Sequence, residues 1–574
     1  MRQPWQQFSW LRPIITTTVV VAAVCAMVVT VYAQEDFTNQ PANPRGSTDG
    51  ATKAPGYNHP NQYMHVKATN IADNMEPVII HADQERIARK KLADLEKKTG
   101  QKPNILVFLT DDCGWLDYGF NGGGVAVGNP TPNLDRFANQ GLILTSAYST
   151  PSCSPTRATI MTGQNPLHHG ILRPPMYGEP GGLQGAATVA SILKQLGYRT
   201  QGVGKWHIGE AKGTVPNEVG FDDYYGFLGV SDMYTEWRDV YFNPEVALSP
   251  DRFAMMEKMN FNHDNVHCTP QGGIKKVYEI DLESIKNLDQ DWCQYSEKFI
   301  ESMKSSEQPF FLYHCTRAAH FDNYPNDEYA GKSPARTVYS DSIVEIDDIF
   351  GRLMKKLEET GQLENTVVLF LGADNGPEAE VPPHGRTPFR GSKGSSWEGG
   401  TRCATFAYWK GMIEPGKSDG LFDYADVFNT CISIAGKPGK EVASFLPADR
   451  YVDGIDQTSF LLGDSALSGR KSRIYTLNQH FSAVRVDEFK YHLVVELQND
   501  IFPLGWKGGF SGSVITETGG VTVTNLYTNP KEDVSDGVRH LPLVIPLGDE
   551  ASRYQKVLQK YPPNFKVVMP GRTK

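Results

Sequence analysis

Two short, almost entirely apolar runs, each followed within three residues by acidic or amide side chains, constrain the fold of this chain most strongly. The runs cover residues 104–110 and 365–371, and they lead into Asp111-Asp112 and Asp374-Asn375-Gly376. A short continuous apolar run is typical of a parallel strand that is covered on both faces. Open α/β sheets place their functional sites at the carboxyl ends of such strands. We therefore expect an α/β fold with polar side chains gathered at one edge of a sheet.

The rest of the chain alternates between helical and strand patterns. Thr188 begins a helical pattern that Gly197 ends, a strand is expected at 200–203, and residues 340–359 carry apolar side chains at helical spacing. Beyond residue 440, the runs 482–486 and 490–495 predict a hairpin, and a closing helix is expected near 550–560. The sequence thus predicts a large, mixed, mostly parallel sheet between helices, with a smaller C-terminal antiparallel sheet and helix.

Composition narrows the class of protein. The 574 residues are 40% hydrophobic and 21% charged, with a formal net charge of -10 and no block of lysine and arginine. This balance suits a large globular core and argues against a nucleic-acid partner.

The N-terminus has the features of an export signal. Arg2 and Arg12 precede an uncharged run at 14–32, and Val31 and Ala33 satisfy the small-residue rule for cleavage. A cleaved signal peptide is the preferred interpretation, with periplasmic or secreted location. An uncleaved membrane anchor is the alternative, because the run approaches spanning length.

The cysteines bear on the compartment. Cys25 lies in the signal, and seven cysteines follow it: Cys113, Cys153, Cys268, Cys293, Cys315, Cys403 and Cys431. If Cys153 is modified, six remain, and disulfides become possible in an oxidising compartment. Cys268 with Cys293 is the preferred pair, and buried free thiols are the alternative.

The segment from Cys153 to Gly163 has the form C-x-P-x-R followed by Thr-Gly. Pro155 near the first helical position, with Ser152 or Ser154 able to cap, predicts that Cys153 lies at a helix N-terminus. Backbone N–H groups there favour negative charge, so an anionic ester would suit the site.

With this motif the chain resembles the type I sulfatases of the alkaline-phosphatase-like superfamily. In that family the motif directs oxidation of the cysteine to formylglycine by a maturation enzyme. The resemblance implies that a hydroxyl of the hydrated aldehyde attacks sulfur, and that the resulting covalent sulfate ester then collapses to release sulfate. An unmodified Cys153 would be a structural or redox thiol.

Two further motifs resemble the metal motifs of that family. Asp111-Asp112-Cys113-Gly114-Trp115 is similar to the first, and Asp374-Asn375-Gly376 is similar to the second. The implied ligands are Asp111, Asp112, Asp374, Asn375 and the modified Cys153. Such an all-oxygen set selects Ca²⁺ or Mg²⁺ over zinc, and calcium is the family's usual ion. For either motif alone, a turn at a strand end is the alternative.

Three elements resemble the family's substrate-binding residues. In Gly204-Lys205-Trp206-His207-Ile208-Gly209 the resemblance implies that Lys205 binds sulfate and His207 bonds the formylglycine hydrate. At a strand end, Lys205 and His207 would point the same way. His320 follows the apolar run 309–313 and is expected to contact sulfate or protonate the leaving group, although the family's proline two residues later is missing. His314 is its rival and is expected within the strand.

A glycine-rich element, residues 390–400, resembles the family's R-G-x-K-x-x-x-x-E-G-G pattern. Lys393 is expected to bind sulfate and the leaving oxygen, while Arg390 and Glu398 shape the loop. Together with Lys205 and Arg157 it would surround the charge that develops in the transition state. The segment 525–533 resembles a strand and turn of the family, with Thr528 in place of an aspartate.

These patterns divide the chain into four parts. They are a signal peptide at 1–33, a linker and extension at 34–101 with an exposed helix near 83–92, a sulfatase catalytic domain at 102–440 and a C-terminal α+β subdomain at 441–574. The expected function is hydrolysis of aryl or carbohydrate sulfate monoesters. A formylglycine-dependent phosphonate monoester hydrolase or phosphodiesterase is one alternative, and a non-enzymatic binding protein on the same scaffold is another.

The polar and aromatic segment 232–295 suits a sugar or aryl leaving group, or else packs an insertion. The candidate substrate contacts are Tyr177, Tyr234, Trp237 and Tyr241. The expected partners are a sulfate ester and a sulfatase-maturation enzyme, and a membrane only if the N-terminal segment is uncleaved.

Overall fold

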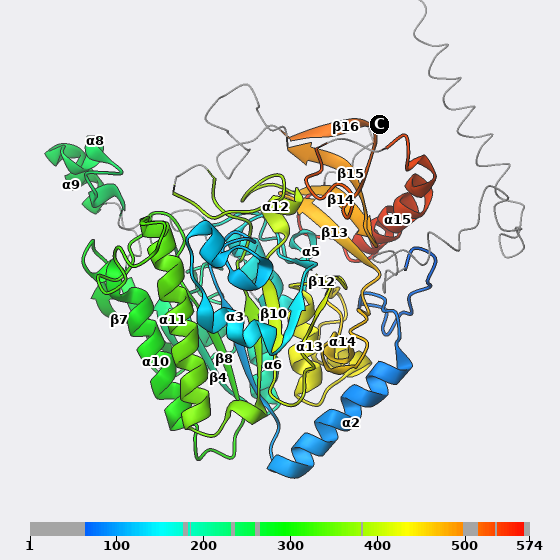
Figure 1. Cartoon of the computed structure of the whole chain (residues 1–574), viewed down its shortest axis with the longest axis horizontal. Coiled ribbons are helices and arrows are strands. Elements are labelled where there is room, and N and C mark those ends of the chain that lie inside the picture. The colour runs from blue at the N-terminus through cyan, green and yellow to red at the C-terminus, as the bar shows by residue number, and fades with distance from the viewer. Residues whose placement is uncertain are drawn as a thin grey trace, which may run out of the picture. The chain divides into compact units, whose positions relative to one another are not determined.

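In the computed structural model, a ten-stranded sheet organises the catalytic part of the chain (Figure 1). The structure describes residues 63–175, 182–183, 185–230, 236–258, 264–379, 383–496, 515–533 and 537–567. In spatial order the strands are β11 (Gly416–Ser418), β2 (Leu142–Leu144), β10 (Thr405–Tyr408), β9 (Thr366–Leu371), β1 (Asn104–Leu109), β8 (Phe310–Cys315), β4 (Arg199–Lys205), β5 (Asp223–Phe227), β6 (Asp264–Thr269) and β7 (Gly273–Glu279).

The middle of this sheet is parallel. β9, β1, β8, β4 and β5 pair in parallel. On one side β10 pairs with β9 in antiparallel fashion, and on the other side the β5–β6 and β6–β7 pairs are antiparallel. Every residue of β1, β8 and β9 is buried. The two apolar runs of the sequence are therefore neighbouring central strands, which confirms the predicted mixed, mostly parallel sheet.

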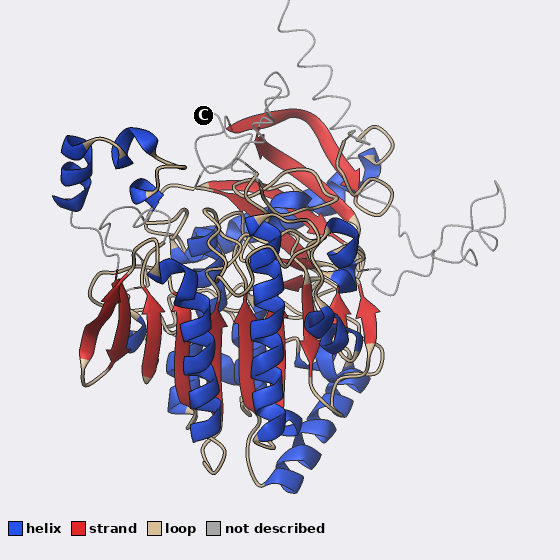
Figure 2. Cartoon of the chain, turned by 60° about the vertical axis from the view of Figure 1, so that its left-hand side comes forward, coloured by secondary structure: helices blue, strands red, loops and turns tan. Residues whose placement is uncertain are grey.

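Helices lie in front of and behind the sheet (Figure 2). One group packs together as α3 (Pro132–Asn139), α10 (Leu288–Ser302) and α11 (Val338–Glu359). A second group contains α4 (Cys153–Thr162), α6 (Val189–Gln195) and α13 (Asp426–Ile434). The predicted helix at 340–359 is α11, and the predicted Thr188 cap is present, since its hydroxyl accepts from Ser191 N at 3.0 Å.

Several shorter elements complete this part. The remaining helices are α2 (Ala82–Thr99), α5 (Pro166–His169), α8 (Pro244–Ala247), α9 (Pro250–Lys258), α12 (Glu398–Thr401) and α14 (Thr458–Leu462). Strands β3 (Ala147–Tyr148) and β12 (Phe422–Asp423) pair in parallel. α2 confirms the charged helix expected near 83–92.

A separate antiparallel sheet forms the C-terminal part. Its strands, in order, are β13 (Ser472–Leu477), β14 (His480–Val486), β15 (Phe489–Glu496) and β16 (Ile515–Asn525). Asp487 adopts φ 51° between β14 and β15, which closes the predicted hairpin. The final helix α15 (Val544–Lys560) packs on this sheet around Phe481, Val484 and Leu547.

The cysteine prediction is wrong in its preferred form. All seven cysteines from Cys113 onward are free and buried. Cys268 lies on β6, and the neighbouring Trp292 of α10 donates to Asn265 of that strand at 3.1 Å. Cys293 lies about 100° further around α10, and its Sγ is 4.0 Å from Ile349 O of α11. The helix therefore turns Cys293 away from Cys268.

The apolar N-terminal run is the segment predicted to be either a cleaved signal peptide or a membrane anchor. Within the described ranges, no helix is both long and apolar enough to cross a bilayer. The predicted signal peptide and the linker up to residue 60 lie outside those ranges.

Candidate active site

The candidate site lies where four neighbouring strands of the sheet end. β9, β1, β8 and β4 are adjacent and parallel, so their carboxyl ends meet at one edge. The predicted side chains that follow these four strands are Asp374 and Asn375 after β9, Asp111 and Asp112 after β1, His320 after β8, and Lys205 and His207 at the end of β4. The sequence-predicted residues thus converge on one buried place.

Cys153 is the first residue of α4, as predicted, and only 1% of it is exposed. The expected serine cap is wrong, because the hydroxyls of Ser152 and Ser154 have no hydrogen-bond partner within the described part of the chain. The Thr156 hydroxyl instead accepts from Thr150 N at 2.9 Å, which fixes the approach of the chain to the helix. Gly163 ends α4 with φ 66°.

Buried charges surround the start of α4. Lys205 Nζ lies 2.5 Å from Asp111 Oδ2, and Lys393 Nζ lies 2.7 Å from Asp112 Oδ2. The Arg157 guanidinium donates to Asp374 Oδ2 at 2.9 Å and to the Lys205 carbonyl oxygen at 2.6 Å. Three carboxylates therefore lie beside three cationic side chains in a buried place, where charge interactions are stronger than in bulk water.

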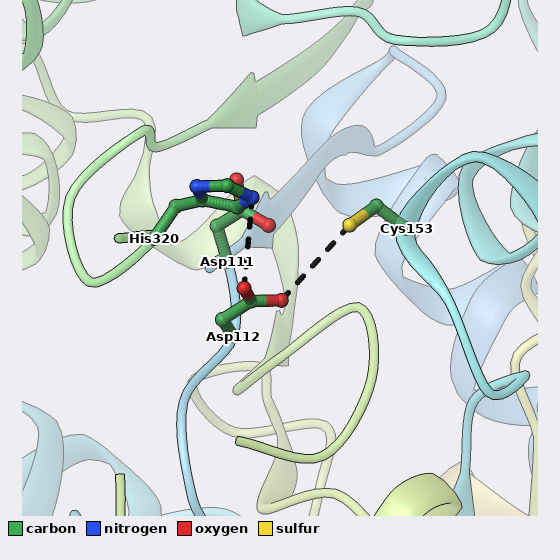
Figure 3. Close-up of side chains that lie close together, drawn as sticks. All are labelled: Asp111, Asp112, Cys153 and His320. Atoms are coloured by element: carbon green, nitrogen blue, oxygen red, sulfur yellow. Dashed lines mark hydrogen bonds and ion pairs between the residues drawn. The ribbon is translucent and has the colours of Figure 1, made fainter. Parts of the chain in front are cut away.

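The same cluster contains oxygen atoms suited to a metal ion. One ligand atom from each of Asp111, Asp112, Cys153 and His320 lies within 4.8 Å of the others, and Figure 3 shows these side chains pointing toward one another. Asp111 Oδ1 and Asn375 Oδ1 are buried and have no hydrogen-bond partner within the described residues. Oxygen atoms of this kind are the ligands that a hard cation such as Ca²⁺ prefers, so the donor set fits the predicted ion.

The acid–base properties follow from burial and from these ion pairs. Burial raises the pKa of Asp374 to about 7, and the neighbouring Asp111 carboxylate adds to the shift. Burial would also raise the pKa of Asp111, but the charges of Lys205 and Arg157 outweigh it and lower that pKa. The cluster therefore holds one strongly ionised carboxylate next to one that ionises near neutral pH.

Cys153 is not a reactive thiolate. Burial, with a smaller contribution from the Asp374 carboxylate, raises the pKa of its thiol well above the usual value. Its Sγ lies 3.9 Å from Asp112 Oδ1, beside the acidic cluster. A thiol that stays protonated is a poor nucleophile, so an unmodified Cys153 is not suited to direct attack.

The histidines separate into site and core residues. His320 Nε2 lies 3.3 Å from Lys393 Nζ and 3.6 Å from Asp112 Oδ2. Both ring nitrogens of His207 are buried without a hydrogen-bond partner among the described residues. His314 lies within β8, as predicted, and its ring bonds Ser296 Oγ at 2.8 Å and stacks on Phe108. The structure therefore favours His320 over His314 as a site residue.

The expected strand geometry at Lys205 and His207 is wrong. β4 ends at Lys205, and His207 adopts φ 55°, outside the extended region. The burial of His207, followed by the charges of Lys205, Arg157 and Lys393, lowers its pKa well below the usual value. A turn, and not strand alternation, thus brings His207 beside these cations.

Lys393 lies on a loop whose backbone is tied to the site. Its N–H donates to Pro377 O at 3.0 Å, and Gly394 N donates to Pro151 O at 2.6 Å, just before Cys153. Gly399 has no space for a side chain, since a Cβ there would lie 2.4 Å from Gly391 O. The glycines of this element therefore permit the close packing that places Lys393.

Sequence reasoning missed Glu378. Its carboxylate is buried and lies 3.9 Å from Lys393 Nζ. Its position, two residues after the Asp374-Asn375-Gly376 turn, is the signal that could have identified it.

The aromatic residues proposed as substrate contacts differ in their exposure to solvent. Trp237 is buried and packs against Phe253 of α9 with ring centroids 4.9 Å apart, which favours packing of the insertion. Tyr241 is 84% exposed. Tyr177 and Tyr234 lie outside the described residues.

Comparisons with known proteins agree with this geometry. The family model "Sulfatase" matches residues 103–437, and the model of a sulfatase AslA C-terminal domain matches residues 482–559. The N-acetylgalactosamine-6-sulfatase of Mus musculus is 29% identical over 470 residues, which are 79% of this chain and 82% of that protein. Arylsulfatase G of Homo sapiens is 30% identical over 384 residues, which are 64% of this chain and 70% of that protein.

Solved structures extend the likeness. The crystal structure of the PsFucS1 sulfatase from Pseudoalteromonas sp. is 36% identical, has a TM-score of 0.81 and covers 88% of this chain and 100% of its own. Ps i-CgsB, solved in complex with k-i-k-neocarrahexaose, is 23% identical with a TM-score of 0.63, over 81% of this chain and 95% of its own, and shares the fold. On its sequence, its site and these relatives, the chain belongs to the sulfatase family, with an alkaline-phosphatase-like fold, and is a sulfuric ester hydrolase.

Proposed function

We propose that this sulfatase hydrolyses sulfate monoesters through a formylglycine made from Cys153, with one Ca²⁺ bound beside it. The observation that carries the proposal is the place of Cys153, at the start of α4 with its Sγ 3.9 Å from Asp112 Oδ1. Formylglycine, once hydrated, would supply a hydroxyl able to attack sulfur, which the buried thiol is not suited to do.

In this proposal Asp111, Asp112, Asp374 and Asn375 hold the ion together with the modified residue 153. Calcium would supply positive charge that draws the sulfate oxygens toward the nucleophile. Arg157 holds Asp374 in position, since its Nε donates to Asp374 Oδ2 at 2.9 Å and its Nη2 makes an ion-pair contact with the same oxygen at 2.9 Å. This charge-assisted contact would orient the carboxylate for the ion.

The remaining polar residues act on the substrate. Lys205 and Lys393 bind the sulfate oxygens and stabilise the charge that develops in the transition state. His207, held neutral at physiological pH by its low pKa, hydrogen-bonds the nucleophile. Burial, followed by the charges of Lys205 and Lys393, lowers the pKa of His320 well below its usual value. A bound sulfate ester would offset those charges, so that His320, 3.3 Å from Lys393 Nζ, can donate a proton to the leaving oxygen.

A sulfated carbohydrate is the natural substrate that we propose. The similar N-acetylgalactosamine-6-sulfatase is named for a sulfated sugar, and arylsulfatase G is named for aryl sulfates. In this chain, the exposed Tyr241 offers an aromatic face on which a sugar ring could stack.

We further propose that the chain is exported to the periplasm or secreted, with the N-terminal segment removed. A sulfatase-maturation enzyme is then a required partner. The mass of the mature N-terminus tests the first point, since a retained residue 1 would contradict cleavage.

Mass spectrometry of the peptide that contains residues 153–157, from active protein, is the decisive experiment. Formylglycine is expected at position 153, and an unmodified cysteine in fully active protein would contradict the mechanism. C153A protein, assayed beside it with p-nitrophenyl sulfate, is expected to lose activity. Parallel assays with phenylphosphonate esters test the alternative, which faster phosphonate turnover would favour.

A further inference from the structure

A second cluster of buried charges lies behind the Lys393 loop, between that loop and the C-terminal sheet. Lys490 of β15 is fully buried, and its Nζ lies 3.1 Å from Glu398 Oε1 and 3.1 Å from Glu532 Oε1. The Tyr148 hydroxyl donates to Glu398 Oε2 at 2.7 Å, and the Tyr475 hydroxyl donates to Oε1 at 2.9 Å. We name Tyr148, Glu398, Tyr475, Lys490 and Glu532 the buried clamp.

The buried clamp is bonded directly to the backbone of the Lys393 loop. Lys490 Nζ donates to the Ser396 carbonyl oxygen at 2.8 Å, and Glu398 N donates to Glu532 Oε2 at 2.8 Å. The Ser482 hydroxyl oxygen of β14 lies 2.6 Å from Ser396 Oγ and 2.8 Å from the Val494 carbonyl oxygen, so it bonds the loop as well as the neighbouring strand. The C-terminal sheet therefore holds Ser396, three residues after Lys393, from behind.

The front of the same loop is bonded to the active site. Lys393 N and Gly394 N donate to Pro377 O and Pro151 O, which flank the Asp374-Asn375 turn and the start of α4. A hydrogen-bonded turn joins Ser392 to Ser395, since Ser395 N donates to Ser392 O at 3.1 Å. The loop is thus short and fixed at both ends, so a shift at Ser396 is transmitted to Lys393.

Burying this many charged groups is costly unless each one is paired. Burial would raise the pKa of Glu398, but Lys490, Arg402 and Arg485 outweigh it and lower that pKa. Glu398 is therefore ionised at neutral pH and depends on Lys490 for compensation.

We propose that Lys490 and Ser482 of the C-terminal sheet are positioning residues for Lys393. The inference rests on the proposed role of Lys393 at the sulfate oxygens, and it makes the C-terminal sheet part of the catalytic unit. Displacement of the Lys393 ammonium is expected to lower the rate more than it lowers the stability of the fold, because catalysis depends on donors that are fixed in position toward the developing charge.

The test compares K490M and S482A with V486A in the holoenzyme. Val486 lies on β14 in the apolar core against α15, whereas Tyr148 and Tyr475 of the buried clamp belong to a different apolar cluster, so V486A lowers stability by removing apolar packing. With p-nitrophenyl sulfate, K490M is expected to lower kcat by about 10- to 1000-fold and S482A by about 3- to 10-fold. V486A is expected to leave kcat within about 2-fold of the wild-type value while lowering Tm.

Two readouts separate positioning from a general loss of structure. Inhibition by inorganic sulfate is expected to weaken several-fold in S482A, whereas V486A leaves it unchanged. In a K393M background, S482A and K490M are expected to change kcat by less than about 2-fold, since they act through Lys393. S482A removes only a hydroxyl, so it carries the test if K490M fails to fold.

The outcomes are distinct. If K393M retains the wild-type kcat, the proposed role of Lys393 fails and the inference fails with it. If K393M is impaired but K490M and S482A behave like V486A, or if their effects multiply with that of K393M, only the positioning inference is overturned.

Discussion

Removal of the Arg157 side chain tests how the carboxylates of the site are held. Arg157 is fully buried, donates from Nε to Asp374 Oδ2, and its Nη2 lies 2.9 Å from the same oxygen and 3.7 Å from Asp111 Oδ1. The variant R157M replaces the guanidinium with a shorter, uncharged side chain and leaves Asp374 without its cation. Breaking a buried ion pair on one side costs about 3 to 5 kcal/mol.

This loss of unfolding free energy can be converted into a shift of the melting temperature, Tm. An unfolding entropy of about 2.1 cal/mol/K per residue gives about 1 kcal/mol/K for the compact unit Pro60–Lys574. R157M is therefore expected to lower Tm by about 3 to 5 °C. The measurement is made in EDTA, so that only charges of the chain contribute, and at about pH 9, where Asp374, whose pKa burial raises to about 7, is ionised in the wild-type protein.

The double variant R157M/D374N is the matched control. It removes the uncompensated carboxylate, so its stability is expected to return to within about 1 kcal/mol of the wild-type value. Its sulfatase activity is expected to remain lost, because Asp374 is a proposed ligand. A loss below about 1 kcal/mol in R157M, or a double variant no more stable than R157M, would refute the reasoning.

Three further predictions concern the ion, a buried acid and the histidines. Calcium at 100 times its Kd is expected to raise the free energy of unfolding, measured with urea, by about 2.7 kcal/mol. An equal rise in the D111N variant would contradict the role of Asp111 as a calcium ligand. Burial raises the pKa of Glu345 to about 8, above its unfolded value, so its contribution to stability is full below about pH 4.5 and declines as the pH rises to 8. The free energy of unfolding of E345Q should therefore rise relative to that of the wild type by on the order of 1 kcal/mol per pH unit over that window. Parallel curves of unfolding free energy against pH for the two proteins would contradict the prediction. H320A is expected to lower kcat more for alkyl than for p-nitrophenyl sulfates, whereas H314Q should change stability alone; equal losses for both esters in H320A would remove its role as an acid.

The sheet and the acidic cluster at its edge were predictable because their signals are local. Continuous apolar runs predict buried parallel strands, and the acidic residues after them lie at strand ends by the geometry of a parallel sheet. β1 and β9 are adjacent partners, with Asn104 opposite Thr366. This adjacency was not readable, since it depends on strand order.

What the sequence did not predict depends on contacts between distant segments. The direction of the Cys293 side chain follows from the packing of α10 against α11. The position of His207 in the site depends on its own left-handed backbone conformation after β4. Glu378 matters only because Lys393, from another loop, lies near it. The division at residue 440 and the roles of the site residues remain predictions.

The buried clamp also limits which segments of such a chain can be exchanged between relatives by recombination. Tyr148 and Glu398 belong to the segment matched by one family model, and Lys490 and Glu532 belong to the segment matched by the other. A chimaera that takes the two segments from different relatives would have to carry over charges and hydroxyls that pair across the junction. The unit of exchange between relatives is therefore the two segments together.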